Sequence, residues 1–411
     1  MYKILHIAAH YGGGVGSIVN AWTNTDKDNI HTLTYLSDLP ENKKENHRLF
    51  DISMVNDHDI VLVHVWNHPM LFQFLTTVNL PPCRLIGWSH MSGLNPPYVL
   101  FRKLVNYFDE FYYTSPVSNL SGIENDFVWS TCDIDKFLKI KKKKHKGFNV
   151  GYIGTLDYCK LHPDFIKICE KIDIPGVYFT VVGHGSDLEN MKKEVKQRGL
   201  ENKFVFTGIV KDTIPYLSEF DVFLYPLNEK HFGTCEQVIG EAMAAGVPCV
   251  SFNNHAEEVI IKNGVNGFLC DTKEDIVQII FDIYNGSIEY NETMLKGCAI
   301  DIYSISKKIS KWNSIFDGII KKEKPVRYWR SPGHIFAESI GPIGAIFDFY
   351  IKMYEQNDLY SLENFIIPGI KKIFKLNGFQ WQSKSKGSLY HYAKFFPEDK
   401  YIKQWIEILC K

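Results

Sequence analysis

The stretch YPLNEKHFGTCEQVIGEAMAAGVPCV, residues 225–250, decides the fold class of this chain. A strand ends at the first of these residues, and a loop then leads into a run with helical character. Thr234 is followed three residues later by Gln237, which is the spacing of a capping box and predicts that a helix begins at Thr234. Gly246 and then Pro248 mark the end of this helix. The stretch therefore predicts a strand, a loop and a helix.

This order of elements predicts a binding site for a phosphate. A helix that follows the carboxyl end of a strand points free N–H groups and its positive dipole end into the adjacent crevice. Glu241 lies two turns into the predicted helix, where a buried carboxylate needs a partner and ribose hydroxyls would serve. The alternative is a glutamate on the surface that forms a salt bridge. When Glu241 is considered alone, this alternative is favoured.

Strand-like runs recur on both sides of this stretch at helix-length intervals. In the same part of the chain they cover 148–153, 177–182, 203–208, 222–225 and 248–252, with helical segments near 273–285 and 300–320. Nearer the N-terminus they cover 3–9, 31–36, 59–65, 84–88 and 110–114. Strands separated by helix-length segments predict a parallel sheet with crossover helices, so we expect two successive α/β units.

Two charged segments divide the chain into domains. The basic run KIKKKKHKG at 139–147 contains almost nothing to bury and is interpreted as a solvated linker, with a membrane-docking patch as the alternative. Beyond the charged stretch 321–324 the pattern becomes helical and rich in aromatic residues. We therefore predict domains at 1–140 and 147–320 and a helical extension at 325–411, whose role the sequence does not indicate.

Composition limits the classes of function. A chain of 411 residues is too long for one hydrophobic core, and its formal net charge of -1 gives no basic field for nucleic acid. The nine cysteines are scattered and form no C-x-x-C pair, which fits free thiols in a reducing cytoplasm. The N-terminus has no signal-peptide pattern, and the most apolar run, 336–354, is interrupted by charges. We expect a cytoplasmic protein; contact with the inner face of the membrane is a hypothesis that rests on 141–146 and the aromatic extension.

Six motifs follow one another along the second α/β unit. They are GTLDYCK at 154–160, GHG at 183–185, FTG at 206–208, DVFLYP at 221–226, EAMAAGVPCV at 241–250, and a glutamate pair at 257–258 before NGVNG at 263–267. In this order and spacing, residues 148–320 resemble the donor-binding half of retaining GT-B glycosyltransferases, the family sometimes called family 4, or glycosyl transferases group 1. The likeness continues more loosely upstream, in GGGVG at 12–16, in Ser89-His90 and in 129–137.

The resemblance implies an α/β fold in which two Rossmann-like domains face a central cleft, with a helical appendage after them. It implies that a sugar moves from a nucleotide-diphosphate sugar to a glycan, a glycolipid or a similar acceptor, with retention of configuration and without a metal or other cofactor. Asp133 and Asp135 spell the D-x-D metal motif of a different glycosyltransferase fold, which we interpret as coincidence. The resemblance thus places the chain in polysaccharide or glycoconjugate biosynthesis.

The resemblance also implies roles for single residues. Donor binding would involve Gly13, Gly14, Thr155, Lys160, Val210, Gly233, Thr234 and Glu241. Lys160, the glycine turn and the N–H groups from Thr234 to Gln237 would stabilise the charge of the diphosphate and of the leaving nucleotide. Glu241 would hold the ribose, and Val210 would offer its backbone to the base. His90 would line the acceptor side, although a histidine at a strand end is equally a structural residue.

Two positions depart from the family pattern. The arginine of the family's G-R-L motif is Thr155 here, which removes a phosphate-binding cation. The glutamate expected eight residues before Glu241 is replaced by Gly233. Glu236 could reach the sugar instead, and it could equally be a surface residue that stabilises the helix dipole. These departures leave room for a degenerate, inactive copy.

Three functions remain open at this point. The leading interpretation is a glycosyltransferase of the hexosyltransferase type. The enzymatic alternative is another GT-B activity, either a sugar-nucleotide epimerase, which would ignore acceptors, or an inverting transferase. The third is a non-catalytic sugar-nucleotide-binding or scaffolding subunit, against which Lys160, Glu241 and the predicted helix start all count.

Overall fold

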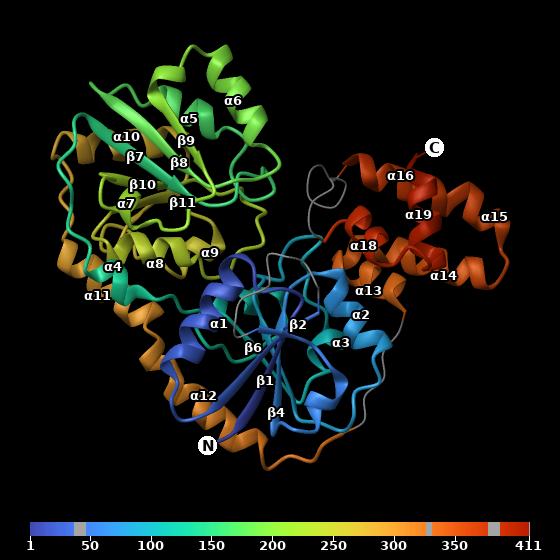
Figure 1. Cartoon of the computed structure of the whole chain (residues 1–411). Helices are drawn as coiled ribbons and strands as arrows, with labels where there is room; N and C mark the ends of the chain where they lie inside the picture. Colours follow the sequence, from blue (N-terminus) through green and yellow to red (C-terminus); the bar gives the residue numbers. More distant parts are fainter. Residues whose placement is uncertain (37–46, 326–330, 377–386, 411) are drawn as a thin grey trace. The chain divides into compact units, whose positions relative to one another are not determined.

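The computed structural model describes residues 1–36, 47–325, 331–376 and 387–410. The chain forms two compact units. The first unit combines residues 1–128 with residues 309–411, and the second consists of residues 129–308. Each unit is built around its own parallel sheet of six strands (Figure 1).

The sheet of the first unit has the strand order β3-β2-β1-β4-β5-β6. Its strands are β1 (Lys3–Ala8), β2 (Ile30–Tyr35), β3 (His47–Leu49), β4 (Ile60–Val65), β5 (Leu85–Ser89) and β6 (Glu110–Tyr113). All neighbouring strands are parallel. Every residue of β4, with the sequence IVLVHV, is buried, as expected for a central parallel strand covered on both faces.

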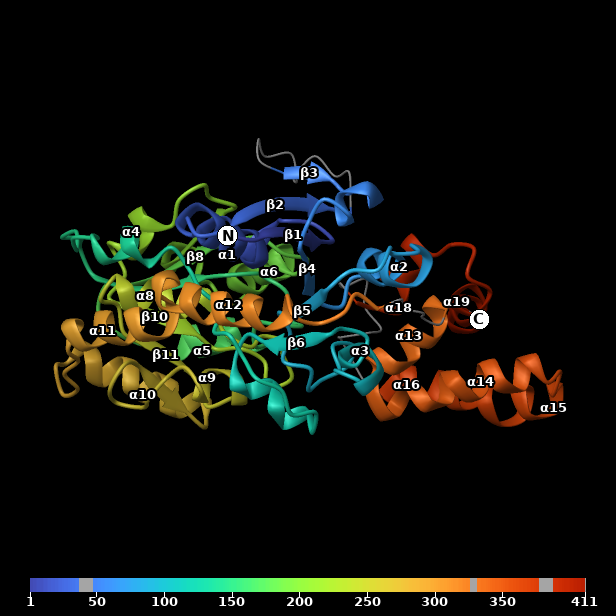
Figure 2. The same cartoon turned by 90° about the horizontal axis from the view of Figure 1, so that it is seen from below.

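Helices of the first unit follow these strands along the chain. They include α1 (Gly13–Thr25), α2 (Pro69–Thr77) and α3 (Arg102–Val105), and two 3-10 helices at Ile52–Val55 and Pro116–Ser121. The long helix α12 (Ile305–Ile319) lies beside the same sheet (Figure 2), and its buried residues are Trp312, Phe316 and Ile319. Trp312 stacks on Trp22 of α1 with ring centroids 4.8 Å apart, and residues 309–319 of α12 belong to the first unit.

The second unit repeats the same topology. Its strands are β7 (Phe148–Ile153), β8 (Val177–Val182), β9 (Phe204–Gly208), β10 (Val222–Tyr225), β11 (Cys249–Phe252) and β12 (Phe268–Cys270), in the order β12-β11-β10-β7-β8-β9. Its helices are α4 (Ile134–Leu138), α5 (Phe165–Lys171), α6 (Leu188–Gln197), α7 (Ile214–Leu217), α8 (Gln237–Ala244), α9 (His255–Glu258), α10 (Lys273–Tyr284) and α11 (Glu292–Tyr303). The predicted fold class is confirmed, since two parallel six-stranded sheets with flanking helices are present.

The helix predicted to begin at Thr234 begins three residues later. In the structure α8 starts at Gln237, its N-cap is Glu236, and no side chain caps it. Thr234 is buried in the preceding loop. The backbone of Glu236 is extended, with φ -69° and ψ 106°, and its carbonyl accepts a hydrogen bond of 2.8 Å from the hydroxyl of Tyr303.

The C-terminal helices pack with the first unit. They are α13 (Pro332–Ser339), α14 (Ala345–Glu355), α15 (Leu359–Ser361), α16 (Ile367–Leu376), α18 (Leu389–Phe395) and α19 (Lys400–Cys410), with a 3-10 helix at Gly341–Gly344 and a π-helix at Leu362–Ile366. Their aromatic core centres on Phe336, Phe347 and Trp405. Tyr392 donates a 2.7 Å hydrogen bond to Asn67, which connects this helical group to the loop after β4.

The boundaries of the compact units differ from those predicted at 140–147 and 320. The basic run 139–147 is not a linker between units, because it lies wholly within the second one. Lys142 donates to the carbonyl of Phe220 at 2.6 Å, and the backbone N–H of Lys143 donates to Ser218 at 2.9 Å. Residues 309–320 join the first unit through Trp312. The charged segments therefore do not coincide with the borders of the compact units.

Candidate functional site

The candidate site of the second unit lies where its strand order reverses. The sheet grows in one direction from β7 to β9 and in the other from β10 to β12, so the loops after β7 and β10 meet at the carboxyl edge. The N–H of Asn228 donates to the carbonyl of Lys160 at 2.7 Å, and the N–H of His162 donates to that of Pro226 at 2.9 Å. Such a reversal point is where open α/β sheets bind their ligands.

Lys160 and Glu236 form a mostly buried ion pair at this point. Lys160 Nζ lies 2.8 Å from Glu236 Oε2, and the exposed fractions of the two side chains are 16% and 8%. The hydroxyl of Tyr225, the last residue of β10, donates to the same carboxylate oxygen at 2.7 Å. Burial raises the pKa of Glu236, but Lys160, His231 and the hydroxyl of Tyr225 together more than offset it, so the pKa lies below its ordinary value. Glu236 is therefore ionised at neutral pH.

Gly233 leaves the space that the Glu236 carboxylate fills. A Cβ atom at position 233 would lie 1.9 Å from Glu236 Oε1, which no side chain can do without displacing the carboxylate. The N-cap conformation of Glu236 is extended, with φ -69° and ψ 106°, and sets the position of its side chain. Glu236 thus places a carboxylate next to the position where the family pattern has one.

A second buried pair, His231 with Glu257, supports the same loop. The N–H of Gly233 donates to His231 Nδ1 at 3.0 Å, and His231 Nε2 lies 3.1 Å from Glu257 Oε2. Glu257 is fully buried, and within the described part of the chain its other oxygen, Oε1, has no hydrogen-bond partner. The glutamate pair at 257–258 gave a sequence signal for Glu257. His231 gave none, because a single histidine in a loop carries no pattern.

Glu241 lies on α8 in a different electrostatic environment. Burial raises the pKa of its carboxyl to about 7, and Lys136 and the hydroxyl of Thr213 lower it only in part. No cation pairs with Glu241 at salt-bridge distance among the described residues. A desolvated carboxylate without a cation is suited to accept hydrogen bonds from hydroxyl groups.

The remaining donor-side residues occupy separate places in the second unit. Thr155 is exposed directly after β7, and its carbonyl accepts a 2.9 Å hydrogen bond from Tyr152. Val210 is half-buried after β9. The structure therefore gathers Lys160, Gly233 and Glu236 into one cluster.

The glycine turn of the first unit leads into α1. Gly13 has φ +67°, a conformation that side chains rarely adopt, and a Cβ there would meet no other atom. Gly14 follows it in the first turn of the helix, whose N-cap, Gly12, has no capping side chain. A Cβ on Gly16 would lie 1.8 Å from the carbonyl oxygen of Tyr11. The turn therefore needs glycine both for its conformation and for close backbone approach.

His90 lies one residue past β5 and belongs to a row of four histidines. Its Nε2 lies 3.0 Å from Nδ1 of His64, and His64 Nε2 lies 3.1 Å from Nδ1 of His6. His6 Nε2 lies 2.8 Å from Nδ1 of His31, and His31 Nε2 lies 3.0 Å from the carboxylate of Asp26. These contacts cross the sheet from β2 to the end of β5. Sequence reasoning named only His90.

Aromatic side chains surround the reversal point of the first sheet, between β1 and β4. His10 follows β1, and Trp66 and His68 follow β4. The ring centroid of His10 lies 5.4 Å from that of Trp66 and 5.3 Å from that of His68. This carboxyl edge therefore carries aromatic rings in edge-to-face contact, where the second unit has charged groups. Sequence reasoning missed all three residues, because they belong to no motif.

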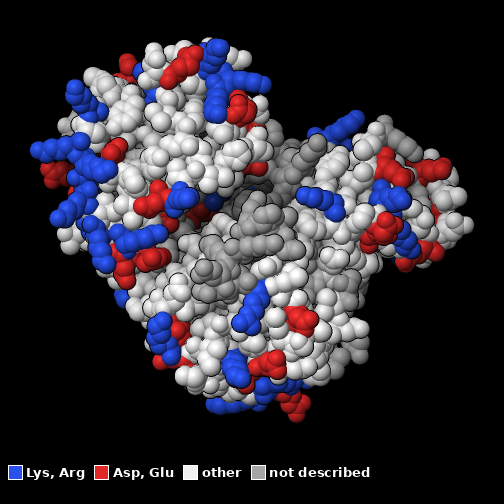
Figure 3. Space-filling view, in the orientation of Figure 1, with Lys and Arg blue, Asp and Glu red and all other residues white. Residues whose placement is uncertain are grey.

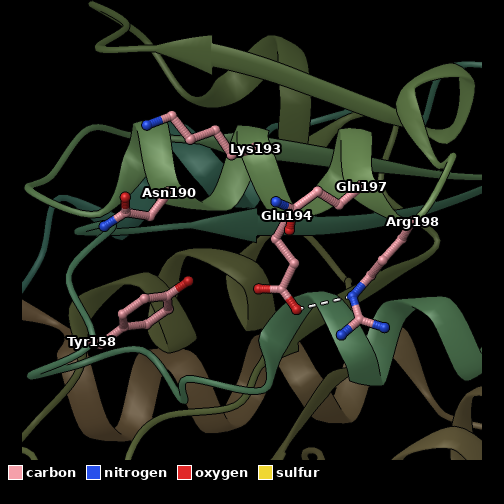
Figure 4. A pocket seen from close by; sticks show the side chains of 6 residues that line it. All are labelled: Tyr158, Asn190, Lys193, Glu194, Gln197 and Arg198. Carbon is pink, nitrogen blue, oxygen red and sulfur yellow. Dashed lines mark hydrogen bonds and ion pairs between the residues drawn. The ribbon is translucent and has the colours of Figure 1, made fainter.

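Other surfaces of the protein give weaker evidence of a binding site. A pocket of about 390 Å³ lies beside α6 and contains none of the predicted site residues (Figure 4). It is lined by Tyr158, Asn190, Lys193, Glu194, Gln197 and Arg198. Positive and negative side chains are interspersed over the face drawn in Figure 3.

In 1–36, 47–325, 331–376 and 387–410, no group of three or more His, Cys, Asp or Glu residues could hold a metal ion. None of the helices described there is long and apolar enough to span a bilayer.

The sequence of the second unit matches a known family. Residues 133–295 match the model of glycosyl transferases group 1. The lipopolysaccharide core biosynthesis glycosyltransferase LpsE of Rhizobium meliloti is 32% identical over 98 residues, which are 24% of this chain and 28% of that protein. The poly(glycerol-phosphate) alpha-glucosyltransferase of Bacillus subtilis is 22% identical over 65% of this chain and 39% of its own length. The chain spans about a quarter to two fifths of the length of these two relatives.

Solved structures share the fold of the whole α/β part. HepE of Anabaena, solved in complex with UDP-glucose, has a TM-score of 0.64 at 16% identity, covering 77% of this chain and 100% of HepE. The lipopolysaccharide outer core galactosyltransferase WaaB has a TM-score of 0.57 at 17% identity, covering 77% and 99%. The chain therefore carries a glycosyl transferases group 1 domain at residues 133–295 and has the fold of GT-B glycosyltransferases.

Proposed function

We propose that this protein is a glycosyltransferase that moves a sugar from a nucleotide-diphosphate sugar to a glycan or a similar glycoconjugate acceptor. The observation that supports it best is the Lys160–Glu236 pair beside Gly233. This cluster lies at the strand reversal of the domain that matches the family. Retention of configuration and independence of metal are part of the proposal.

The chemistry of the donor explains the residue types at this site. The leaving nucleoside diphosphate gains negative charge as the glycosidic bond breaks, and a fixed cation in a mostly buried site stabilises that charge more than water would. Lys160 is that cation, and Glu236 holds it in place in the free protein. Glu241 accepts hydrogen bonds from the ribose hydroxyls, which supply its desolvated carboxylate with donors in addition to the hydroxyl of Thr213.

The acceptor is proposed from the relatives that match the chain. Their names include lipopolysaccharide core, poly(glycerol-phosphate) and 2-deoxystreptamine, which all offer hydroxyl groups on a polar scaffold. The half-buried rings of His10 and Trp66, which meet edge to face, suit the apolar faces of a sugar, since aromatic rings pack against C–H groups while polar edges remain solvated. A lipid-linked acceptor and peripheral membrane contact belong to the same proposal, and sedimentation with anionic vesicles at low salt tests them.

Calorimetric titration with nucleotide sugars tests donor binding. One donor among UDP- and GDP-sugars is expected to bind, and Lys160→Ala and Glu241→Ala are each expected to weaken it at least tenfold. Lys262→Ala and Glu258→Ala remove the same charges from exposed positions of the same unit and should leave the affinity unchanged. Absence of binding by any donor to the folded protein would contradict the proposal.

Moving the carboxylate from position 236 to position 233 tests the role of Glu236. Glu236→Ala is expected to abolish transfer, and adding Gly233→Glu should restore part of it, because the alanine vacates the space that a side chain at 233 needs. Failure of the second substitution to restore activity in a folded, donor-binding protein would show that Glu236 serves the structure only.

Product analysis separates the proposed reaction from its alternatives. NMR of the product should show the anomeric configuration of the donor, and a chelator should not change the rate. Interconversion of the free nucleotide sugar without an acceptor would indicate an epimerase. Binding without turnover across a panel of glycan acceptors would indicate a non-catalytic subunit.

A further inference from the structure

We propose that Asp26 acts through His31, His6 and His64 to fix the tautomer of His90, so that His90 Nδ1 is a hydrogen-bond acceptor for a substrate hydroxyl. Asp26, His31, His6 and His64 are positioning residues in this proposal. The assignment of the hydroxyl rests on the proposed function, whereas the assignment of the tautomers rests on the hydrogen bonds alone.

The row of rings is continuous and lacks any gap that water would fill. Its four contacts measure 3.0, 2.8, 3.1 and 3.0 Å between Asp26 and His90. His6 and His64 are fully buried. Trp22 lies against His6 and His31, with ring centroids 5.1 and 5.4 Å apart. Trp88 covers the other end, 4.7 Å from His90.

The carboxylate at one end orients every ring in the row. Each nitrogen pair shares one proton, so each ring must donate at one nitrogen and accept at the other. Asp26 accepts from Asn29 and from the backbone N–H of Asp28 as well, so it is held as an anion and can only accept from His31 Nε2. His31 Nδ1 then accepts from His6 Nε2, and the same order repeats through His64.

His90 is the open end of this row. Its Nε2–H is donated to His64 Nδ1, which leaves Nδ1 unprotonated. Across the described residues His90 Nδ1 has no hydrogen-bond partner, and the ring is half-buried at the carboxyl end of β5. A lone pair at this place accepts from a hydroxyl and repels a carbonyl or phosphate oxygen.

The same count of hydrogen-bond donors and acceptors excludes the opposite orientation of the rings. If each ring donated from Nδ1, His31 Nε2 would present a lone pair to the Asp26 carboxylate across 3.0 Å, unless Asp26 were protonated. Hydrogen bonds from Asn29, Asp28 and His31 lower the pKa of Asp26 despite its burial. Burial also lowers the pKa of all four histidines, so none of them is an imidazolium that would donate at both ends.

NMR of the full chain labelled with ¹⁵N-histidine tests the tautomers directly. Couplings between ring protons and nitrogens distinguish Nε2–H from Nδ1–H, and single His→Gln variants assign the signals. At pH 7.5 we expect His31, His6, His64 and His90 to be in the Nε2–H form. Either Nδ1–H or a charged ring at His90 would overturn the proposal.

Two substitutions test whether Asp26 is the cause. Asp26→Asn offers both an amide donor and an amide acceptor to His31, so His90 should become a mixture of tautomers. Asp57→Asn makes the same change of charge at an exposed position of this unit and should leave His90 unchanged. If Asp26→Asn does not fold, His31→Gln interrupts the row next to Asp26, with the same expected result. A single Nε2–H form of His90 in either folded variant would overturn the proposal.

Measurements of KM and of donor affinity distinguish this inference from the proposed function. Asp26→Asn should raise KM for the acceptor about tenfold, with a smaller change in donor affinity. Replacing the contacted hydroxyl by fluorine, which cannot donate, should raise KM in the native protein and have little further effect in Asp26→Asn. An equal penalty in both proteins would overturn the role in binding. If no transfer is found at all, the proposed function fails, while the NMR result still decides the tautomers.

Discussion

The two α/β units share one topology, but their clusters of buried polar groups differ in charge. Numbered within its own unit, each sheet has the order 3-2-1-4-5-6. In the second unit the buried polar groups are ions that compensate each other, as in the pair of Lys160 and Glu236. In the first unit they are neutral imidazoles joined end to end, with only Asp26 charged.

This difference teaches that backbone topology places a site but does not determine its chemistry. The reversal point brings the same two loops together in both units, since it depends only on strand order. A charged group can be buried where a group of opposite charge lies within hydrogen-bond distance. Buried histidines avoid the desolvation cost of a charge by staying neutral. The family match at 133–295 covers the charged site and not the histidine row.

The largest expected effect comes from breaking the ion pair. Lys160→Met should destabilise the second unit by about 3–5 kcal/mol, because it leaves the Glu236 carboxylate buried without its cation. Urea-induced unfolding measures this, and Lys262→Met serves as the exposed control. Adding Glu236→Gln should recover most of the loss. If the double variant is as unstable as the single one, packing and not charge holds this site.

The next effect has the opposite sign and depends on pH. The pKa of Glu241 is raised to about 7 in the folded protein, so stability that is complete below the unfolded pKa near 4.5 is lost as pH rises through 7. Glu241→Gln should therefore stabilise the protein by about 3 kcal/mol at pH 8 and hardly at all at pH 4. Denaturant unfolding at both pH values, with Glu258→Gln as control, measures the difference. Destabilisation at pH 8 would contradict the assigned environment.

The histidine row predicts sensitivity to acid. Burial lowers the pKa of His90 to about 3, so its contribution to stability is present above pH 6.5 and is lost as pH falls towards 3. Between pH 7.5 and 5.5, His90 should account for a loss of about 1.4 kcal/mol. His90→Gln should reduce the loss on acidification by that amount, whereas His255→Gln, an exposed histidine of the second unit, should not. Equal acid sensitivity in all three proteins would contradict a neutral, buried row.

The smallest expected effect distinguishes the glycines of the two sites. Gly13 needs only its conformation, so Gly13→Ala should cost about 1 kcal/mol and leave its neighbours in place. Gly233 needs only space, so Gly233→Ala should displace the Glu236 carboxylate and weaken donor binding more than it lowers stability. Thermal unfolding together with calorimetry separates the two. Unchanged donor binding in a folded Gly233→Ala variant would contradict this comparison.

Much of the fold and part of the site could be predicted from local patterns. Continuous apolar runs such as that of β4 require a covered parallel sheet, so the alternation of strands and helices indicated both units. Lys160, Glu236 and Gly233 were named because they belong to motifs of fixed spacing. The start of α8 lies three residues beyond the predicted one, and its N-cap carbonyl accepts a hydrogen bond from Tyr303, which is 67 residues away from Glu236. His231, His10 and His68 follow no pattern that a linear reading detects.

The amino-acid sequence by itself determined the two repeated α/β units, the charged donor-side motifs and the family match, because these depend on periodicity and spacing within short stretches. Only the tertiary structure decided which residues belong to each unit. It shows that residues 309–319 of α12 and the C-terminal helices belong to the first unit. It alone joined Asp26 to His90, since the four histidines come from four segments of the sheet. The physical reason is that hydrogen bonds and burial act through space, and their partners cannot be inferred from spacing along the chain.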